Sequence, residues 1–405
     1  MSSSRKLRIA FATPEFVTEN HFDGGLANYI NRVSKALANL GHDVHVVTLS
    51  TKTEEEFGHG GVMVHRVMLK PGWHTLNRLT RYSLPTTLHW LNFSTQAYRK
   101  LKQLHRREPF HVIQYPNYSS CGLFAIPLLR TTHVIRASSQ PGWNTWVQQN
   151  FDLTVTELLE ALQYKLGRNV YASSRVIQQK LSAHDARLIR TPFYVEDRAW
   201  DEAVYDQFLS NKKYVLYFGR FQMHKGFHTL AQALPRFLTH CPDAHVALVG
   251  RDMETSLASS MAAFARAQCN GFGERLLIVE NLPHSQLYPV IAGAHLVVLP
   301  SLIDNLPNAG LEAMGLGKVV IGTDGTSFEE LISDGVNGFL VPPDNPQALA
   351  DKMIAAWTDQ RLAAMSSAAK EKVQEFAPEK TIPALLSYYS ELLSHDRDQN
   401  QQPDS

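Results

Sequence analysis

The stretch LPSLIDNLPNAGLEAMGLGKVVIGT, residues 299–323, decides the fold that this sequence predicts. Its pattern indicates three elements in succession: an apolar strand over 295–300, a short helix over 311–316 and a second buried strand over 318–322. The loop before the helix holds Pro307 and the small residues Asn308, Ala309 and Gly310. Small residues let the backbone approach a ligand, and the first N–H groups of a helix have no intrahelical partner. Such a helix start favours an anion, most naturally a diphosphate.

Two carboxylates, Asp304 and Glu312, bracket this helix start with seven residues between them. They would repel each other, and the anion, if both bound the phosphate groups. We therefore interpret them as acceptors of hydroxyl hydrogen bonds on either side of the diphosphate. A sugar on one side and a ribose on the other would fit this arrangement. The alternative is a strand–helix–strand unit with two ordinary surface acids.

The segment DNLPNAGLEAMGLGKVV resembles the E-x7-E signature of the retaining glycosyltransferases of family 4, with Asp304 in place of the first Glu. The resemblance extends over residues 7–393 and is loose over 55–190. It implies the GT-B fold, an α/β architecture of two Rossmann-like parallel-sheet domains that face each other across a cleft. In this fold a C-terminal helix crosses back to the N-terminal domain.

The length of 405 residues is also too great for one hydrophobic core and predicts two domains. We expect the following limits: residues 1–195 as the N-terminal acceptor domain, 196–377 as the C-terminal donor domain, 378–394 as the crossover helix, and 395–405 as a disordered polar tail.

The composition is that of an ordinary globular enzyme, with 44% hydrophobic and 19% charged residues. Cys121, Cys241 and Cys269 are scattered and odd in number, which favours a reducing compartment without structural disulfides. The sequence contains no apolar run of about 18 residues and no hydrophobic signal segment. These features favour a cytoplasmic protein without a membrane span of its own.

The charge is distributed unevenly along the chain. Residues 1–190 hold 23 Lys and Arg against 12 Asp and Glu, a net +11, whereas residues 191–405 hold 16 against 26, a net −10. The basic residues of the first half concentrate over 66–107. A solvated helix face is one explanation. A docking surface at the inner face of an anionic membrane, or for a lipid-phosphate acceptor, is the other.

The start of the chain is a strand–loop–helix–strand unit, which predicts a parallel sheet. Gly24 and Gly25 lie where the loop enters the helix and would allow close approach to a ligand. The resemblance implies that this loop faces the donor phosphates and the acceptor. After a later strand at 134–136, many relatives have a His that faces the sugar. This sequence has no His there, and Arg136, Ser138 and Ser139 are the polar groups available instead.

In the second half, several predicted strands end at residues suited to binding a ligand. Gly219 and Arg220 follow one strand, Gly250 and Arg251 a second, and Asn281 and Leu282 a third. Ligands in parallel α/β sheets bind beyond the carboxyl ends of the strands, so we expect these loops to converge.

Arg220 and Lys225 stand in the segment GRFQMHKG, which matches the family's phosphate-binding pattern. A guanidinium can bind phosphate oxygens with two hydrogen bonds, and an ammonium adds a point charge. Together they would stabilise a departing diphosphate. A surface Arg and Lys at a helix start is the alternative.

The candidate site residues lie in both halves of the chain. The catalytic candidates are Asp304, Arg220, Lys225 and Glu312, and the donor-binding candidates are Gly24, Gly25, Gly219, Arg220, Lys225, Gly250, Arg251, Asn281, Leu282, Asp304, Asn308, Ala309, Gly310, Leu311 and Glu312. Asp304 would hold sugar hydroxyls, Glu312 the ribose, and Leu282 would stack on the base.

We expect no metal and no prosthetic group. The only Asp-x-Asp, Asp396 to Asp398, lies in the polar tail, and the histidines show no ligand spacing. The resemblance implies retention of anomeric configuration. A covalent route needs a carboxylate beneath the anomeric carbon, and none is identifiable, which favours a front-face mechanism in which the leaving phosphate oxygen takes the acceptor proton.

The sequence therefore predicts a metal-independent retaining hexosyltransferase that moves a sugar from a nucleotide-diphosphate sugar, a UDP- or GDP-sugar, to an acceptor hydroxyl. The acceptor would be a glycan, a glycolipid, a lipid-linked precursor or a small molecule, with cell-envelope or exopolysaccharide assembly as the expected setting and no nucleic acid partner. A catalytically silent GT-B binding partner and a nucleotide-sugar epimerase are the alternatives.

Overall fold

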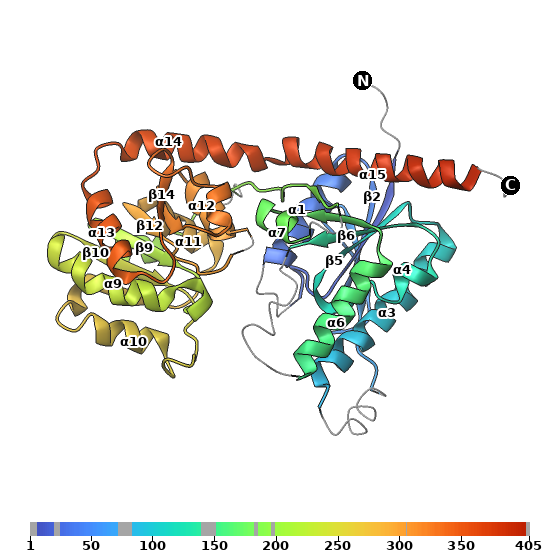
Figure 1. Cartoon of the computed structure of the whole chain (residues 1–405), viewed down its shortest axis with the longest axis horizontal. Helices are drawn as coiled ribbons and strands as arrows, with labels where there is room; N and C mark the ends of the chain where they lie inside the picture. The colour runs from blue at the N-terminus through green and yellow to red at the C-terminus, as the bar shows by residue number, and fades with distance from the viewer. Residues whose placement is uncertain are drawn as a thin grey trace. The chain divides into compact units, whose positions relative to one another are not determined.

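The computed structural model describes residues 6–19, 25–71, 83–138, 151–181, 185–195, 199–304 and 306–401. The chain divides into two compact units, each with its own sheet and core (Figure 1). Unit 1 consists of Met1–Pro192 together with Pro378–Ser405, and unit 2 consists of Phe193–Ala377.

Unit 1 is built on an 8-stranded sheet in the order β3-β4-β2-β1-β5-β6-β7-β8. Its strands are β1 (Arg8–Thr13), β2 (Asp43–Leu49), β3 (Glu56–His59), β4 (Val62–Val67), β5 (Val112–Pro116), β6 (Thr132–Ala137), β7 (Asn169–Ala172) and β8 (Arg187–Leu188). Its described helices are α1 (Gly25–Asn39), α3 (Pro85–Arg107), α4 (Ala125–Leu128), α6 (Phe151–Leu166), α7 (Arg175–Lys180) and α15 (Pro378–Gln401), with a 3-10 turn η1 (Tyr118–Ser120).

The hairpin of β3 and β4 corrects the prediction of a purely parallel sheet. These two strands pair in antiparallel fashion, while β4 joins β2 in parallel. Gly60 and Gly61, both with positive φ, form the tight turn between them. The hairpin was not predicted because its alternation of polar and apolar residues covers only four residues in β3.

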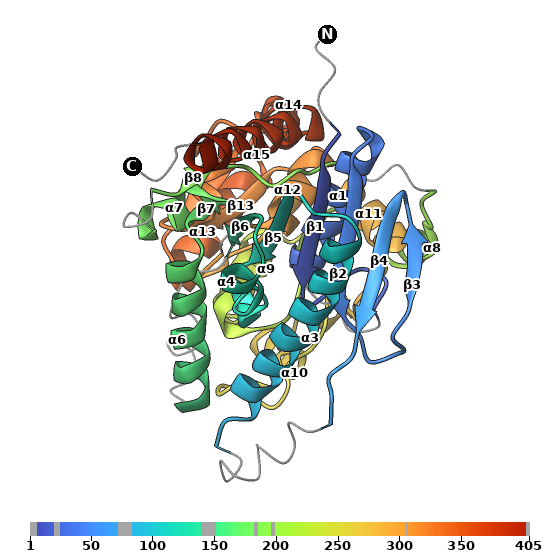
Figure 2. The same ribbon diagram turned by 90° about the vertical axis from the view of Figure 1, so that its right-hand side faces the viewer.

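Helices cover both faces of the unit 1 sheet (Figure 2). Successive residues of a strand point to opposite faces, so Ile9 and Phe11 pack toward α1 and α15, whereas Ala10 and Ala12 pack toward α3. All four side chains are fully buried. Complete burial of an Ile or Phe side chain contributes about 1.5–3 kcal/mol, so the two apolar layers hold the sheet between its helices.

A buried hydrogen-bond network attaches α15 to unit 1. Tyr389 of α15 donates to Gln114 Oε1 over 2.5 Å, and Gln114 Nε2 donates to the Tyr29 hydroxyl over 2.9 Å. The hydroxyls of Tyr29 and Tyr171 lie 2.6 Å apart. Because buried polar groups must be paired, this network fixes the position of the C-terminal helix on the sheet.

The C-terminal helix is longer than the sequence predicted. It ends at Gln401, not at Ser394, so the expected disordered tail from residue 395 is wrong over its helical part. Residues 395–401 contain neither Gly nor Pro, and the next Pro is at 403. Without a residue that terminates the helix, the backbone hydrogen bonds continue through polar residues.

Unit 2 has a 6-stranded, fully parallel sheet in the order β11-β10-β9-β12-β13-β14. Its strands are β9 (Tyr214–Phe218), β10 (His245–Val249), β11 (Leu276–Val279), β12 (Leu296–Val298), β13 (Val320–Thr323) and β14 (Gly338–Val341). Its helices are α8 (Ala203–Phe208), α9 (Phe227–His240), α10 (Met261–Gln268), α11 (His284–Gly293), α12 (Asn308–Gly315), α13 (Pro346–Trp357) and α14 (Leu362–Val373), with 3-10 turns η3 (Met223–Lys225), η4 (Gly273–Arg275), η5 (Ser327–Glu330) and η6 (Gln374–Phe376).

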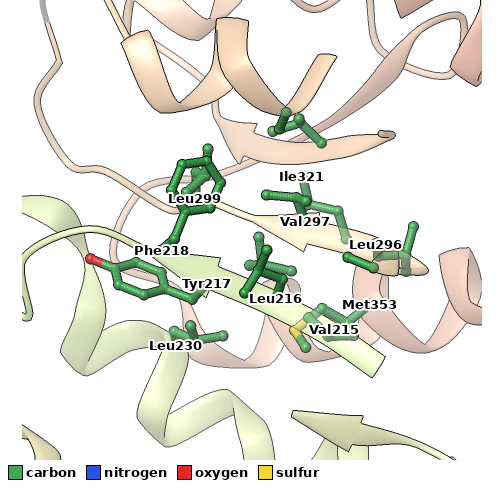
Figure 3. Close-up of a cluster of buried hydrophobic side chains, with 14 of the residues drawn as sticks. Val215, Leu216, Tyr217, Phe218, Leu230, Leu296, Val297, Leu299, Ile321 and Met353 are labelled. Carbon is green, nitrogen blue, oxygen red and sulfur yellow. The ribbon is translucent and has the colours of Figure 1, made fainter. Parts of the chain in front are cut away.

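The core of unit 2 surrounds its central strands β9 and β12. Figure 3 shows the side chains of these strands with Leu230 of α9 and Met353 of α13 packed against them. Both strands read as continuous apolar runs because a central parallel strand is covered by helices on both faces. This pattern made them predictable, whereas α10 and α14 were missed because each holds only two or three buried side chains.

Three of the basic side chains from the 66–107 region are neutralised by acids of unit 1. Arg66 pairs with Glu19 at 2.7 Å and with Glu55, Lys70 with Glu54 at 2.7 Å, and Lys100 with Glu56 at 3.0 Å. Arg106 and Arg107 are exposed at the end of α3. The charge run in the sequence therefore overstates the positive charge that this region presents to solvent. Of the helices described, none is long and apolar enough to cross a membrane.

A pair of buried histidines joins the β2 and β4 strands. His45 Nδ1 lies 2.9 Å from His65 Nε2, and their rings are stacked with centroids 5.2 Å apart. Asp43 lies 3.2 Å from His45, and Glu56 lies 3.4 Å from His65. Burial lowers the pKa of His65 to about 4, against the opposing effect of Glu56. The His65 imidazole is therefore neutral in the folded protein at neutral pH.

This pair predicts acid sensitivity of unit 1. The unfolded chain protonates His65 near its ordinary pKa of 6.5, whereas the folded chain does so only near 4, so stability present above pH 6.5 is lost as pH falls toward 4. Between pH 7 and 5 the loss is about 2 kcal/mol. Urea unfolding should show a shallower pH dependence for His65→Phe than for wild type. The exposed-site control His240→Gln should retain the wild-type slope, and an unchanged slope in His65→Phe would contradict the argument.

Candidate functional site

The helix that follows the carboxyl end of β12 begins earlier than predicted. Helix α12 starts at Asn308, so Asn308, Ala309 and Gly310 form its first turn and not a loop. Its first internal bond runs from the Leu311 N–H to the Pro307 carbonyl over 3.0 Å. The three preceding N–H groups have no intrahelical acceptor, and no side chain caps this end. Within this first turn Gly310 lies close to Phe328, because a Cβ there would come within 3.0 Å of the ring.

Lys225 and Asp304, predicted to act on different parts of the donor, are paired directly. The Lys225 ammonium lies 2.7 Å from Asp304 Oδ2, with side chains 30% and 12% exposed. The Ser327 hydroxyl donates to the Asp304 backbone carbonyl over 2.6 Å, which fixes the loop that carries the carboxylate. The structure therefore places a cation of the β9 loop against a carboxylate of the β12 loop.

Arg220 follows β9 and is exposed at the carboxyl edge of the sheet. Within the part of the chain that the structure describes, its side chain forms no ion pair. Its backbone is fixed, because the Tyr217 hydroxyl donates to the Arg220 carbonyl over 2.8 Å. The backbone that carries the guanidinium is thus fixed, and the N–H groups of the side chain can donate to an anion.

Two glycines after neighbouring strands are in close contact. The Gly219 N–H donates to Val249 over 2.9 Å, and a Cβ on Gly250 would lie 1.8 Å from the Gly219 carbonyl oxygen. The Phe221 N–H donates to the Arg251 carbonyl over 3.0 Å. The loops after β9 and β10 therefore converge, as the sequence predicted, and glycine is required where they meet.

His224 lies between the two cations of this edge. Its carbonyl accepts the N–H of Leu302 over 3.0 Å, so it joins the β9 loop to the β12 loop. Burial, reinforced by the charges of Lys225 and Arg220, lowers the pKa of His224 to about 4. The imidazole is therefore neutral at pH 7 and adds no charge to the site.

Glu312 has a partner that sequence reasoning missed. The Glu312 side chain is 10% exposed, and its Oε1 lies 3.5 Å from Nε2 of His284, the first residue of α11. His284 comes shortly after Asn281 and Leu282, the residues predicted to bind the base. Its contact with Glu312 therefore joins α12 to the loop after β11. No motif marks His284, although its position after the β11 loop was a signal that it lies at this edge.

The remaining predicted residues of unit 2 lie at the same edge. Arg251 and Asn281 are exposed and are each the second residue after a strand, whereas Leu282 is half-buried and is the third residue after β11. Leu311 is fully buried in the unit 2 core, so it supports α12 and presents no side chain to a ligand.

The predicted residues of unit 1 are described in part. Gly25 is the exposed first residue of α1, whereas Gly24 and Ser139 lie outside the described residues. Arg136 is 5% exposed near the end of β6, and Ser138 follows that strand and is half-buried. Among the described residues no group of three or more His, Cys, Asp or Glu could hold a metal ion.

Comparison with protein families accounts for both units. Residues 24–191 match the "Glycosyl transferase 4-like domain", and residues 212–359 match "Glycosyl transferases group 1". Both matches describe enzymes that transfer sugars, so the chain is a glycosyltransferase. It belongs to the group 1 glycosyltransferases of family 4, which confirms the resemblance found in the sequence.

Individual relatives agree with this assignment over nearly the whole chain. The chain is 25% identical to D-inositol 3-phosphate glycosyltransferase of Paenarthrobacter aurescens, over 92% of this chain and 94% of the relative. It is 23% identical to phosphatidyl-myo-inositol mannosyltransferase of Mycolicibacterium smegmatis, over 87% of this chain and 86% of the relative.

Solved structures confirm the GT-B fold. Sucrose-phosphate synthase of Thermosynechococcus elongatus superposes with a TM-score of 0.76 at 21% identity, covering 96% of this chain and 100% of that one. HepE of Anabaena, solved with UDP and glucose, superposes with a TM-score of 0.71 at 19% identity, covering 95% and 100%.

Gly226 supplies a test of how the β9 and β12 loops are held together. It adopts φ +66, and a Cβ there would lie 1.7 Å from the Pro300 carbonyl oxygen. Gly271, with φ +91, has open space around it, so Gly271→Ala should cost only the left-handed strain of about 1–2 kcal/mol. Gly226→Ala adds the backbone overlap and should lower the free energy of unfolding by more. Denaturant melts of the two variants would decide, and equal losses would contradict the contact.

Proposed function

We propose that the chain transfers a hexose from a nucleoside-diphosphate sugar to an acceptor hydroxyl, with retention of configuration and without a metal ion. The observation that carries the proposal is the convergence of Arg220, the Lys225–Asp304 pair and the free N–H groups of α12 at one sheet edge. HepE, which shares the fold, binds UDP and glucose. This supports a nucleotide-sugar donor, with UDP and GDP as the two candidates.

The diphosphate would bind between Arg220 and the start of α12. The helix offers three N–H groups and the positive end of its dipole, and its first turn contains no acid. Arg220 supplies a fork of donors suited to two phosphate oxygens. As the bond to the sugar breaks, charge grows on the leaving phosphate, and these groups stabilise it most in the transition state.

Lys225 would exchange partners when the donor binds. In the ligand-free chain its ammonium is held by Asp304 at 2.7 Å. A diphosphate carries more charge than one carboxylate and would compete for the ammonium. The released Asp304 could then accept hydrogen bonds from sugar hydroxyls, the role predicted from its place in the signature. Asp is shorter than the usual Glu, and Ser327 compensates by fixing its backbone.

Glu312 would bind the ribose hydroxyls. Glu312 is buried, and the His284 imidazole, 3.5 Å away, holds its carboxylate in position. A buried carboxylate that accepts two hydroxyl donors is satisfied only when the ribose is present. His284 is therefore a positioning residue for this contact.

Two relatives indicate the class of acceptor. The names of the Paenarthrobacter and Mycolicibacterium enzymes specify inositol 3-phosphate and phosphatidyl-myo-inositol, both of which carry a phosphate beside free hydroxyls. We infer a phosphate-bearing polyol or lipid headgroup as acceptor. With a lipid acceptor, the exposed Arg106 and Arg107 of α3 would favour an anionic membrane surface.

A thermal-shift screen against UDP, GDP, ADP and their sugar conjugates tests the donor assignment. A ligand that binds only the folded chain stabilises it by about 2.7 kcal/mol at 100 times its dissociation constant. One nucleotide should raise the melting temperature and its sugar conjugate should raise it further. No shift with any nucleotide would favour the silent binding partner.

Turnover of the identified donor should depend on two of the proposed residues. Arg220→Met should lower kcat about 100-fold or more, because it removes charge stabilisation from the leaving group. Glu312→Gln should weaken donor binding about 10- to 100-fold, the worth of a hydrogen bond to a charged group. Arg236, an exposed arginine of α9 paired with Asp351, gives the matched control Arg236→Met, which should retain activity. Wild-type rates in folded Arg220→Met would refute the assignment.

The partner exchange of Lys225 predicts opposite effects on two ligands. Asp304→Asn frees Lys225, so the nucleoside diphosphate should bind about fivefold tighter, since a partly exposed ion pair is worth about 1 kcal/mol. The nucleotide sugar should lose its additional affinity over the diphosphate. Asp324, which directly follows β13, gives the control. Asp324→Asn removes a charge at the same edge without removing the partner of Lys225, so it should change neither the affinity for the diphosphate nor the additional affinity for the nucleotide sugar. Calorimetric titration of both ligands measures this, and weaker diphosphate binding in Asp304→Asn would contradict the exchange.

A further inference from the structure

Unit 1 contains a buried positive charge that the fold does not neutralise. Arg136 of β6 is 5% exposed, and a guanidinium stays protonated at any physiological pH. Within the described residues it forms no ion pair with a carboxylate. Removing such a charge from water costs several kcal/mol unless a partner compensates it.

The contacts of Arg136 compensate this charge only in part. Nη2 donates to the Thr191 hydroxyl over 2.9 Å, and the guanidinium carbon lies 3.7 Å from the centroid of the Tyr29 ring. Nε is buried and has no hydrogen-bond partner. Nη1 also makes no hydrogen bond to a described residue. A guanidinium presents five N–H donors, so most of them are unused.

A second unpaired polar group lies beside it. Ser173, directly after β7, is 1% exposed, and its hydroxyl has no partner. Its N–H donates to Ala137 at the end of β6 over 3.0 Å. Arg136 pairs in register with Tyr171, so the alternation of side chains places Arg136 and Ser173 on the same face of the sheet. Ser138, the next residue on that face, donates its N–H to Asn117 Oδ1 over 2.9 Å, so only its hydroxyl is offered to a ligand.

These groups stand where ligands bind in an α/β sheet. Strands β6 and β7 run parallel. Arg136 and Ser138 lie at the carboxyl end of β6, and Ser173 lies at the carboxyl end of β7. A cluster with donors in excess and one uncompensated positive charge selects an oxyanion. A phosphate, with several oxygens on one centre, can accept from the guanidinium and from a hydroxyl together.

We propose that Arg136, with Ser173 and Ser138, binds a phosphate group of the acceptor substrate in unit 1. The inference rests on the proposed function in that it treats the ligand as the acceptor. The phosphate itself can belong to a soluble phosphorylated polyol or to a phospholipid headgroup, because both present the same oxyanion. Arg136 would thereby select acceptors that carry a phosphate over neutral sugars.

Phosphate binding can be measured without any nucleotide. Inorganic phosphate is titrated against sodium chloride of matched ionic strength, with the melting temperature as readout. The background is Arg220→Met, which weakens phosphate binding in unit 2. A saturable rise is expected there, and adding Arg136→Met should reduce the phosphate affinity at least tenfold. Generic stabilisation by phosphate as a salt is common to both proteins and cancels in the comparison.

Two further variants separate anion binding from a structural role. Thr191→Val removes the hydrogen-bond partner of Arg136 but not its charge, so phosphate affinity should persist even if the melting temperature falls. Arg136→Lys keeps the charge without the planar fork and should bind phosphate several-fold more weakly. If Arg136→Met does not fold, the phosphate affinity of Arg136→Lys tests the proposal in its place. Unchanged phosphate affinity in Arg136→Lys and Arg136→Met would overturn the proposal.

The source of the phosphate is identified by two parallel measurements. A soluble inositol phosphate is titrated calorimetrically, and sedimentation with phosphatidylcholine vesicles is compared with and without phosphatidylinositol. If Arg136→Met weakens binding of the inositol phosphate, the acceptor is soluble. If it weakens binding to the vesicles that contain phosphatidylinositol, the acceptor is a lipid. If it changes neither measurement, the proposal is overturned. If nucleotides fail to bind while phosphate binding depends on Arg136, the donor assignment fails and the anion site stands.

Discussion

Parallel pairing of the strands in unit 2 is the constraint on which the candidate site depends. Because β9, β10, β12 and β13 run in one direction in a common register, the residues that follow them emerge at one edge of the sheet. Gly219, Arg220 and Asp304 come from different parts of the chain but share this edge. Side chains on both faces of these strands are packed into the core of unit 2, so close packing maintains the register.

The electrostatics of the two units follow different principles. In unit 2 the charges at the sheet edge are paired or exposed, so a ligand can exchange with an existing partner, as Lys225 and Asp304 illustrate. In unit 1 Glu19 and Arg66 are buried and compensate each other, with the Ser50 hydroxyl 2.5 Å from Glu19. Arg136 departs from this rule, because it is buried and no carboxylate is among its described partners. This difference is the reason to treat Arg136 as a ligand-binding group.

Buried polar contacts outside the site maintain the fold around it. Gln114 joins α1 and α15 through tyrosine hydroxyls, so the network connects the first and last parts of unit 1. The His45–His65 pair links the β2 and β4 strands but makes that link dependent on neutral imidazoles. Neither feature takes part in the proposed chemistry, yet both determine the conditions under which the sheet of unit 1 is stable.

The sequence by itself determined the strands of unit 2, the glycines between their loops and the family. These features depend on local pattern: continuous apolar runs, residues that permit close backbone contact, and the spacing from Asp304 to Glu312. The order of strands, the pairing of Lys225 with Asp304 and the contact of His284 with Glu312 were decided only by the tertiary structure. So were the β3–β4 hairpin and the isolation of Arg136 from any described carboxylate. The physical reason is that charge pairing and burial depend on distances between residues far apart in the chain, and no local pattern encodes those distances.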